Sequence, residues 1–135
     1  MSAQPDPLAA DVIVYVDHSD IHDGRLEELE EGIRQLVEFI EAREPQLIAY
    51  GFHLDEAEGH MTVTAVHPDS ASLELHMEIG REGFRKLGEM ITLRQVEVYG
   101  TISDRAREML EQKVQMLGGS VRVTERFSGF ARTQT

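Results

Sequence analysis

The hydrophobic pattern changes its period at His67-Pro68, and this change constrains the fold more than any other feature of the chain. Over residues 60–66 apolar side chains alternate with polar ones, which is typical of a strand with one buried face. Pro68 has no N–H group to donate to a continuing strand ladder. We therefore expect a strand over residues 60–67 that ends at this proline.

The segment that follows has the spacing of an amphipathic helix. Asp69 or Ser70 can accept a backbone N–H group as the N-cap. Leu73, His76 and Met77 then lie three and four residues apart, so they share one face of the helix and His76 is expected to point inward.

Two glycines interrupt this helical pattern. Gly80 and Gly83 are poor helix formers, and they predict a break into two short helical pieces, with Phe84 packing under the second. A broken helix of this kind could act as a lid.

The rest of the chain alternates between strand and helix patterns. Residues 12–16 are almost wholly apolar and β-branched, which predicts a central strand buried on both faces. Residues 18–24 are expected to form a turn, and Thr101 with Asp104 matches a capping box. The other expected elements are a helix over residues 25–43, strands over 47–54, 92–100 and 120–127, and a helix between the last two strands.

This order, βαββαβ followed by αβ, predicts an α+β fold. The first six elements correspond to a ferredoxin-like antiparallel sheet with two helices on one face. We expect tails over residues 1–10 and 128–135, a ferredoxin-like domain over 11–100 and an αβ extension of that domain over 101–127. Apolar residues occur on both sides of the strands, so the uncovered sheet face predicts a homodimer with sheet packed on sheet.

Composition excludes several partners. The formal net charge of −12 over 135 residues argues against nucleic acid and anionic membrane surfaces, which select basic patches. The sequence has no apolar run long enough for a signal peptide or a membrane span. It contains no cysteine, which suits a cytoplasmic location and leaves neither disulfides nor thiolate metal sites.

The passage HPDSASLELHMEIGREGF resembles the strand-to-helix region of the antibiotic biosynthesis monooxygenase-like family, in the dimeric α+β barrel superfamily. Asp69, His76 and Phe84 occupy the positions of an acidic helix start, a mid-helix histidine and a later phenylalanine. The resemblance covers roughly residues 11–99. It implies a homodimeric barrel that binds a small apolar or aromatic ligand, and cofactor-independent oxygenation of an aromatic or quinol-like substrate.

His76 is the candidate acid or base, because a helix-borne imidazole can exchange a proton near neutral pH. The alternative is a core histidine bonded to a backbone carbonyl. Tyr15, Tyr50, His53 and Phe84 are the candidate substrate-binding residues, although tyrosines in central strands are commonly packing residues.

Two other functions remain open from the sequence. Oxygenases of this family often use Asn and Trp, and the chain contains neither, which favours a non-catalytic ligand-binding or structural protein of the same fold. His18 and His22 with Asp17, Asp20 and Asp23 have ligand types that suit a divalent metal, but their segment reads as a loop.

Overall fold

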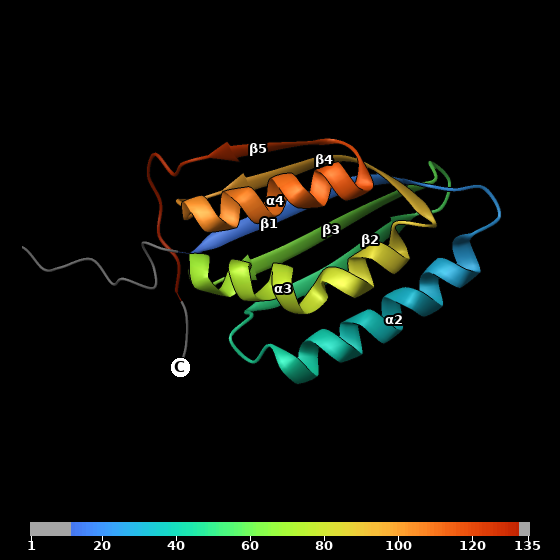
Figure 1. Cartoon of the computed structure of the whole chain (residues 1–135), viewed down its shortest axis with the longest axis horizontal. Helices are drawn as coiled ribbons and strands as arrows, with labels where there is room; N and C mark the ends of the chain where they lie inside the picture. The colour runs from blue at the N-terminus through green and yellow to red at the C-terminus, as the bar shows by residue number, and fades with distance from the viewer. Residues whose placement is uncertain (1–11, 133–135) are drawn as a thin grey trace, which may run out of the picture.

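The structure, a computed structural model, describes residues 12–132 as one five-stranded sheet and three helices. The strand order is β2-β3-β1-β4-β5, and Figure 1 shows the helices together over one face of the sheet. The elements in chain order are β1 (Ile13–Ile21), α2 (Leu26–Arg43), β2 (Ala49–Asp55), β3 (His60–His67), α3 (Ser70–Leu87), β4 (Ile91–Tyr99), α4 (Asp104–Leu117) and β5 (Ser120–Thr124).

The predicted α+β, ferredoxin-like arrangement is confirmed. β1 is central and pairs antiparallel with both β3 and β4, and β2 pairs antiparallel with β3. The predicted tail over residues 1–10 lies outside the described residues, as do residues 133–135. No helix in the described part of the chain is long and apolar enough to cross a membrane.

β1 is longer than predicted and is buried on only one face. The predicted turn at residue 18 is wrong, because β1 continues to Ile21 with Asp20 paired to both neighbouring strands. The extension was not recognised in the sequence because most of its residues are polar, as those of a turn usually are. Along β1 buried residues alternate with partly exposed ones, and Val14 is 36% exposed. Burial on both faces is therefore also wrong for the single chain.

α3 is one continuous helix, so the predicted break and lid are wrong. Its glycines allow close packing rather than a break. A Cβ atom on Gly80 would overlap the ring of Phe84, and one on Gly83 would overlap the side chain of Leu36 on α2. The low helix propensity of glycine is thus offset by side chains that lie directly against the helix backbone.

The helix caps agree with the sequence in one case and differ in another. Asp69 caps α3, and its Oδ1 accepts a hydrogen bond from the Ser72 backbone N–H group over 2.9 Å. The predicted capping box at Thr101 is wrong. Ser103 caps α4 instead, with its Oγ accepting from the Ala106 N–H group over 3.0 Å.

The αβ extension returns to its own sheet. α4 packs against α3 and β4, and β5 pairs parallel with β4 at the sheet edge. The strand ends at Thr124 rather than at residue 127, and Phe127 is fully exposed. Figure 1 shows α4 lying over β4 beside α3, which places it above the same sheet face as the other helices.

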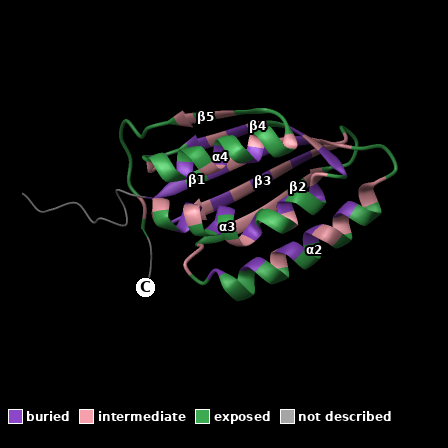
Figure 2. Ribbon diagram, viewed as in Figure 1, coloured by how far each residue is buried: buried purple, intermediate pink, exposed green. Residues whose placement is uncertain are grey.

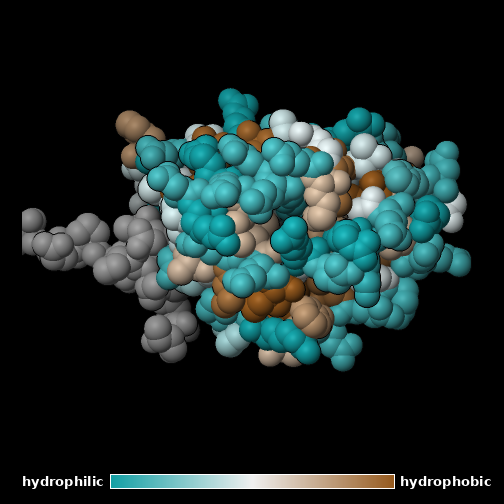
Figure 3. Space-filling model, in the orientation of Figure 1, coloured by the Kyte–Doolittle hydropathy of each residue, from teal (hydrophilic) through white to brown (hydrophobic). Residues whose placement is uncertain are grey.

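The two faces of the sheet differ in their surroundings. Figure 2 shows the buried side of each helix turned toward the sheet, and Figure 3 shows mainly hydrophilic side chains on the outer helix face. No helix among residues 12–132 covers the opposite sheet face, which mixes apolar Val14, Val16 and Tyr99 with threonines and histidines. The sheet-on-sheet homodimer stays a prediction.

We predict that Gly80→Ala destabilises the protein, although alanine favours helices. The new methyl group must displace the Phe84 ring from its packed position, and overpacking of this kind costs about 1–3 kcal/mol. Urea denaturation measures the change. Glu78→Ala, on the exposed side of the same helix, is the control and should be close to neutral. A Gly80→Ala protein more stable than the wild type would contradict this account of the glycine.

Candidate functional site

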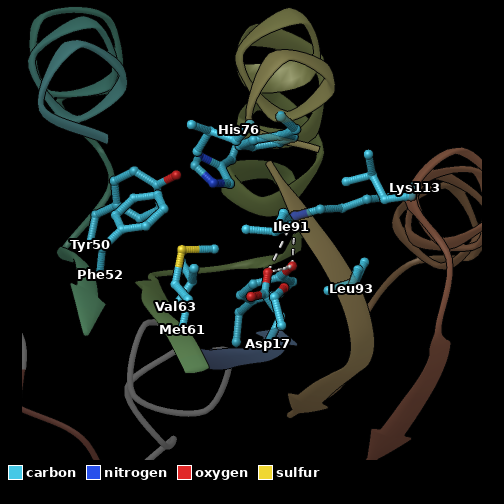
Figure 4. A pocket seen from close by; sticks show the side chains of 14 residues that line it. Asp17, Tyr50, Phe52, Met61, Val63, His76, Ile91, Leu93 and Lys113 are labelled. Atoms are coloured by element: carbon cyan, nitrogen blue, oxygen red, sulfur yellow. Dashed lines mark hydrogen bonds and ion pairs between the residues drawn. The ribbon is translucent and has the colours of Figure 1, made fainter. Parts of the chain in front are cut away.

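A narrow cavity lies between the sheet and helices α3 and α4. It has room for about two water molecules as it stands, so a larger ligand requires its side chains to move apart. Figure 4 shows side chains converging on it from the sheet below and from the helices above. Its lining residues are Tyr15, Asp17, Ser19, Tyr50, Phe52, Met61, Val63, His76, Phe84, Leu87, Ile91, Leu93, Lys113 and Leu117.

His76 reaches this cavity from the inner face of α3 and is paired with a buried carboxylate. Its Nδ1 lies 3.0 Å from both Glu44 carboxylate oxygens, and both residues are almost fully buried. Nδ1 therefore donates to Glu44, which fixes the tautomer and the ring orientation. Among residues 12–132 no hydrogen bond engages Nε2 of His76, so this nitrogen is available to accept a proton.

Glu44 was missed by the sequence analysis. It follows the last residue of α2 and precedes Pro45, where a negative charge gains nothing from the helix dipole. A glutamate at the end of a helix with several other acidic residues is usually solvated, so its place at the helix end gives no sign of burial. A glutamate next to a helix-stopping proline is the one local signal that could have identified it.

A second polar cluster joins the central strand to α4. The Tyr15 hydroxyl donates to Asp17 Oδ2 over 2.6 Å, and Lys113 Nζ donates to the Tyr15 oxygen over 2.7 Å. Lys113 Nζ is also 3.6 Å from Asp17 Oδ2 and 4.2 Å from the centre of the Phe84 ring. Figure 4 shows Lys113 extending from α4 toward Asp17.

Burial changes the proton affinity of these groups. It raises the pKa of Tyr15 well above its usual value, with the Asp17 charge adding to the effect. It lowers the pKa of Lys113, although Asp17 opposes that change. Tyr15 is thus held as a neutral donor, and a buried amine with one carboxylate partner lies at the cavity wall.

Four of the five sequence-derived site residues meet at this cavity. The Tyr50 ring packs edge-on against His76 with centroids 5.0 Å apart, and the Phe84 ring lies 5.3 Å from His76. Tyr15 forms part of the floor. His53 does not join them, because it is exposed on the opposite sheet face, with Nε2 3.1 Å from Thr64 Oγ1.

The alternative metal site is not assembled. His18 is on β1 rather than in a loop, and it contacts His60 and Glu97 on the open sheet face. Asp17 points to the helix-covered face, and His22 contacts Thr92. No group of three or more metal-ligating side chains occurs in the described part of the chain.

His67 makes a second buried imidazole beside the site. Its Nδ1 is 2.8 Å from Ser72 Oγ, its Nε2 has no partner among the described residues, and its ring lies 5.3 Å from that of His76. Burial, reinforced by repulsion from His76, lowers the pKa of His67 to about 3. The folded protein therefore keeps this imidazole neutral at physiological pH.

We predict that His67 makes the protein acid-sensitive. Between pH 6.5 and about 3 the unfolded chain protonates this histidine and the folded chain does not, so stability falls as pH falls. The contribution approaches one proton, or about 1.4 kcal/mol per pH unit. As the pH is lowered from 6.5 to 4.5, urea denaturation should show that His67→Gln loses stability less steeply than the wild type. The control His22→Gln, at an exposed histidine, should lose stability as steeply as the wild type. Parallel slopes for wild type and His67→Gln would show that the buried ring is protonated in the folded state.

Comparison with solved structures shows the fold of antibiotic biosynthesis monooxygenase-like proteins. MupZ from Pseudomonas fluorescens aligns with a TM-score of 0.71 and 17% identity over 90% of this chain and 95% of its own. SnoaB, a cofactor-independent oxygenase from Streptomyces nogalater, aligns with a TM-score of 0.58 and 18% identity over 70% and 96%. An antibiotic biosynthesis monooxygenase aligns with a TM-score of 0.55 and 22% identity over 67% and 99%.

The sequence resemblance to this family is thus confirmed at the level of fold. The alignments with SnoaB and the third structure cover a share of the chain close to the share made up by residues 11–100. The alignment with MupZ covers 90% of the chain, so it must include residues outside that range. No family model matches the sequence, and no curated protein matches it either.

Proposed function

We propose that the protein binds a small aromatic or quinol-like molecule in the cavity and oxidises it with molecular oxygen, without a cofactor. The observation that carries the proposal is the buried His76–Glu44 pair, which presents a free imidazole nitrogen beside apolar and aromatic walls. The fold shared with SnoaB, itself a cofactor-independent oxygenase, supports the same reaction class.

His76 is the catalytic base in this proposal. Its Nε2 removes the proton of a ring hydroxyl, and Glu44 stabilises the resulting imidazolium through Nδ1. Glu44 is a positioning residue because it acts only through His76. Tyr50 and Phe84, whose rings pack beside His76, hold the substrate ring. The apolar walls exclude water, which strengthens the electrostatic interactions in the site.

The oxidation balances without another reagent. The ring anion transfers electrons to oxygen, and a C–O bond forms at a ring carbon that carries hydrogen. The imidazolium returns its proton to the outer oxygen. Loss of the C–H proton then breaks the O–O bond, so that one oxygen atom stays as a carbonyl and the other leaves as water. A phenol, HO–Ar–H, and O₂ thereby give a quinone and water.

We predict that His76→Ala lowers the oxidation rate of aromatic quinols by a factor of about 100 or more, because a positioned base contributes rate factors of that size. Oxygen uptake in chelator-treated buffer measures the rate. His53→Ala, on the other sheet face, should keep the wild-type rate, and Glu44→Gln should fall between the two with a shifted pH profile. Equal rates for wild type and His76→Ala would remove the assigned role.

A non-catalytic ligand-binding protein is the second candidate. The absence of Asn and Trp favours it, since oxygenases of the family that this chain resembles often use these residues. The same experiment separates the two functions. Ring compounds that raise the melting temperature but are not consumed would favour binding alone, because a ligand of the native state stabilises without turnover.

We also propose that the protein acts as a cytoplasmic homodimer joined through the open sheet faces. Val14, Val16 and Tyr99 supply apolar area there, and no described element covers it. The absence of cysteine suits a reducing compartment.

We predict that Val14→Lys converts this dimer to a monomer, because a charge on the central strand would be buried without a partner in each half of a twofold interface. Sedimentation velocity at micromolar concentration measures the association. Leu75→Lys is the matched control, since Leu75 is similarly exposed, at 38%, but lies on the outside of α3. A wild-type protein that sediments as a monomer would contradict the dimer.

A further inference from the structure

Two polar atoms in the floor of the cavity have no hydrogen-bond partner. Among the described residues Asp17 Oδ1 and Ser19 Oγ are buried and unpaired, and both residues line the cavity. Asp17 is 4% exposed and Ser19 is 0% exposed. Buried polar groups in folded proteins are nearly always bonded, so an unpaired pair at one cavity wall indicates a place for a bonding partner.

β1 brings these two atoms to the same side of the sheet. Residues two apart on a strand share a face, and their Cα atoms lie about 6.6 Å apart along it. Both side chains therefore rise from the central strand toward the helices. Figure 4 shows Asp17 doing so beneath His76, with Lys113 beside it.

The surroundings of Asp17 decide which of its oxygens is free. Oδ2 accepts the Tyr15 hydroxyl over 2.6 Å and lies 3.6 Å from Lys113 Nζ. A carboxylate can only accept hydrogen bonds. Oδ1 is left as an acceptor without a partner among the described residues, on a side chain that lines the cavity.

We propose that Asp17 and Ser19 form an acceptor subsite for a hydroxyl group of the ligand, and that α4 completes this subsite by using Lys113 to hold Asp17. The inference rests on the proposed function, which requires an aromatic ring in the cavity, and it narrows the ligand class to dihydroxylated rings. One hydroxyl of the ring meets His76, and the single proton of the second is shared between Asp17 Oδ1 and Ser19 Oγ in a three-centre hydrogen bond. The αβ extension thereby contributes to ligand selection.

A pair of ring ligands tests the subsite without any turnover. Hydroquinone carries two hydroxyl donors, and 1,4-dimethoxybenzene has the same ring with none. Binding of each is measured by NMR chemical-shift titration under nitrogen, with wild type, Ser19→Ala and Ser120→Ala. Ser120 is exposed on β5 and serves as the matched control. Asp17→Asn is the less suitable variant, because it also breaks the ion pair with Lys113 and can unfold the protein.

We expect Ser19→Ala to weaken hydroquinone binding about tenfold and to leave dimethoxybenzene binding unchanged, since one buried hydrogen bond is worth about that factor. Its melting temperature should not fall, because the lost hydroxyl has no partner in the free protein. The Ser120→Ala control should bind both ligands as the wild type does.

Each possible outcome decides between the subsite and its alternatives. An unchanged hydroquinone affinity in Ser19→Ala, or an equal loss for both ligands, overturns the subsite and leaves the proposed oxidation standing. Failure of both rings to bind the wild type overturns the subsite and the proposed function together. Selective loss of hydroquinone binding supports the subsite. This holds even if His76→Ala and wild type oxidise quinols at the same rate, a result that would remove only the proposed oxidation.

Discussion

The burial of Lys113 against Asp17 and Tyr15 is the interaction on which the arrangement of the site depends. Removing a carboxylate and an amine from water costs several kcal/mol for each, and only close pairing with additional hydrogen bonds offsets that cost. Here the Tyr15 hydroxyl supplies the additional bonds, accepting from Lys113 and donating to Asp17. The pairing ties α4 to the central strand, and it leaves the other carboxylate oxygen of Asp17 buried without a partner among the described residues.

Local patterns predicted most of the fold. The alternation before Pro68 located β3, Asp69 located the start of α3, and the order of elements led to the ferredoxin-like sheet. The errors occurred where tertiary contacts override local preference. Gly80 looks like a helix breaker until the Phe84 ring is seen against it, and the polar end of β1 looks like a turn until the strands on either side are known.

The site was predicted only in part, because its charged members come from segments far apart in the chain. His76 could be placed by helical spacing alone. Glu44, Asp17 and Lys113 each resemble surface residues, and only their partners explain their burial. A signal did exist for Lys113, since it lies three residues after Leu110 and four before Leu117 on the inner face of α4. One lysine within an apolar stripe is, however, usually a long side chain that reaches solvent.

The contact between Tyr15 on β1 and Lys113 on α4 has a consequence for how the chain folds during synthesis. Tyr15 and Lys113 are 98 residues apart, so the contact closes one of the longest loops available to this protein. On the ribosome the first strand emerges long before α4, and its aspartate stays in water or unpaired until the last helix has been translated. Contacts between distant segments are also slow to form. The cavity is thus completed only after α4 has been translated, and a nascent chain truncated before α4 lacks the ammonium group that neutralises the cavity floor.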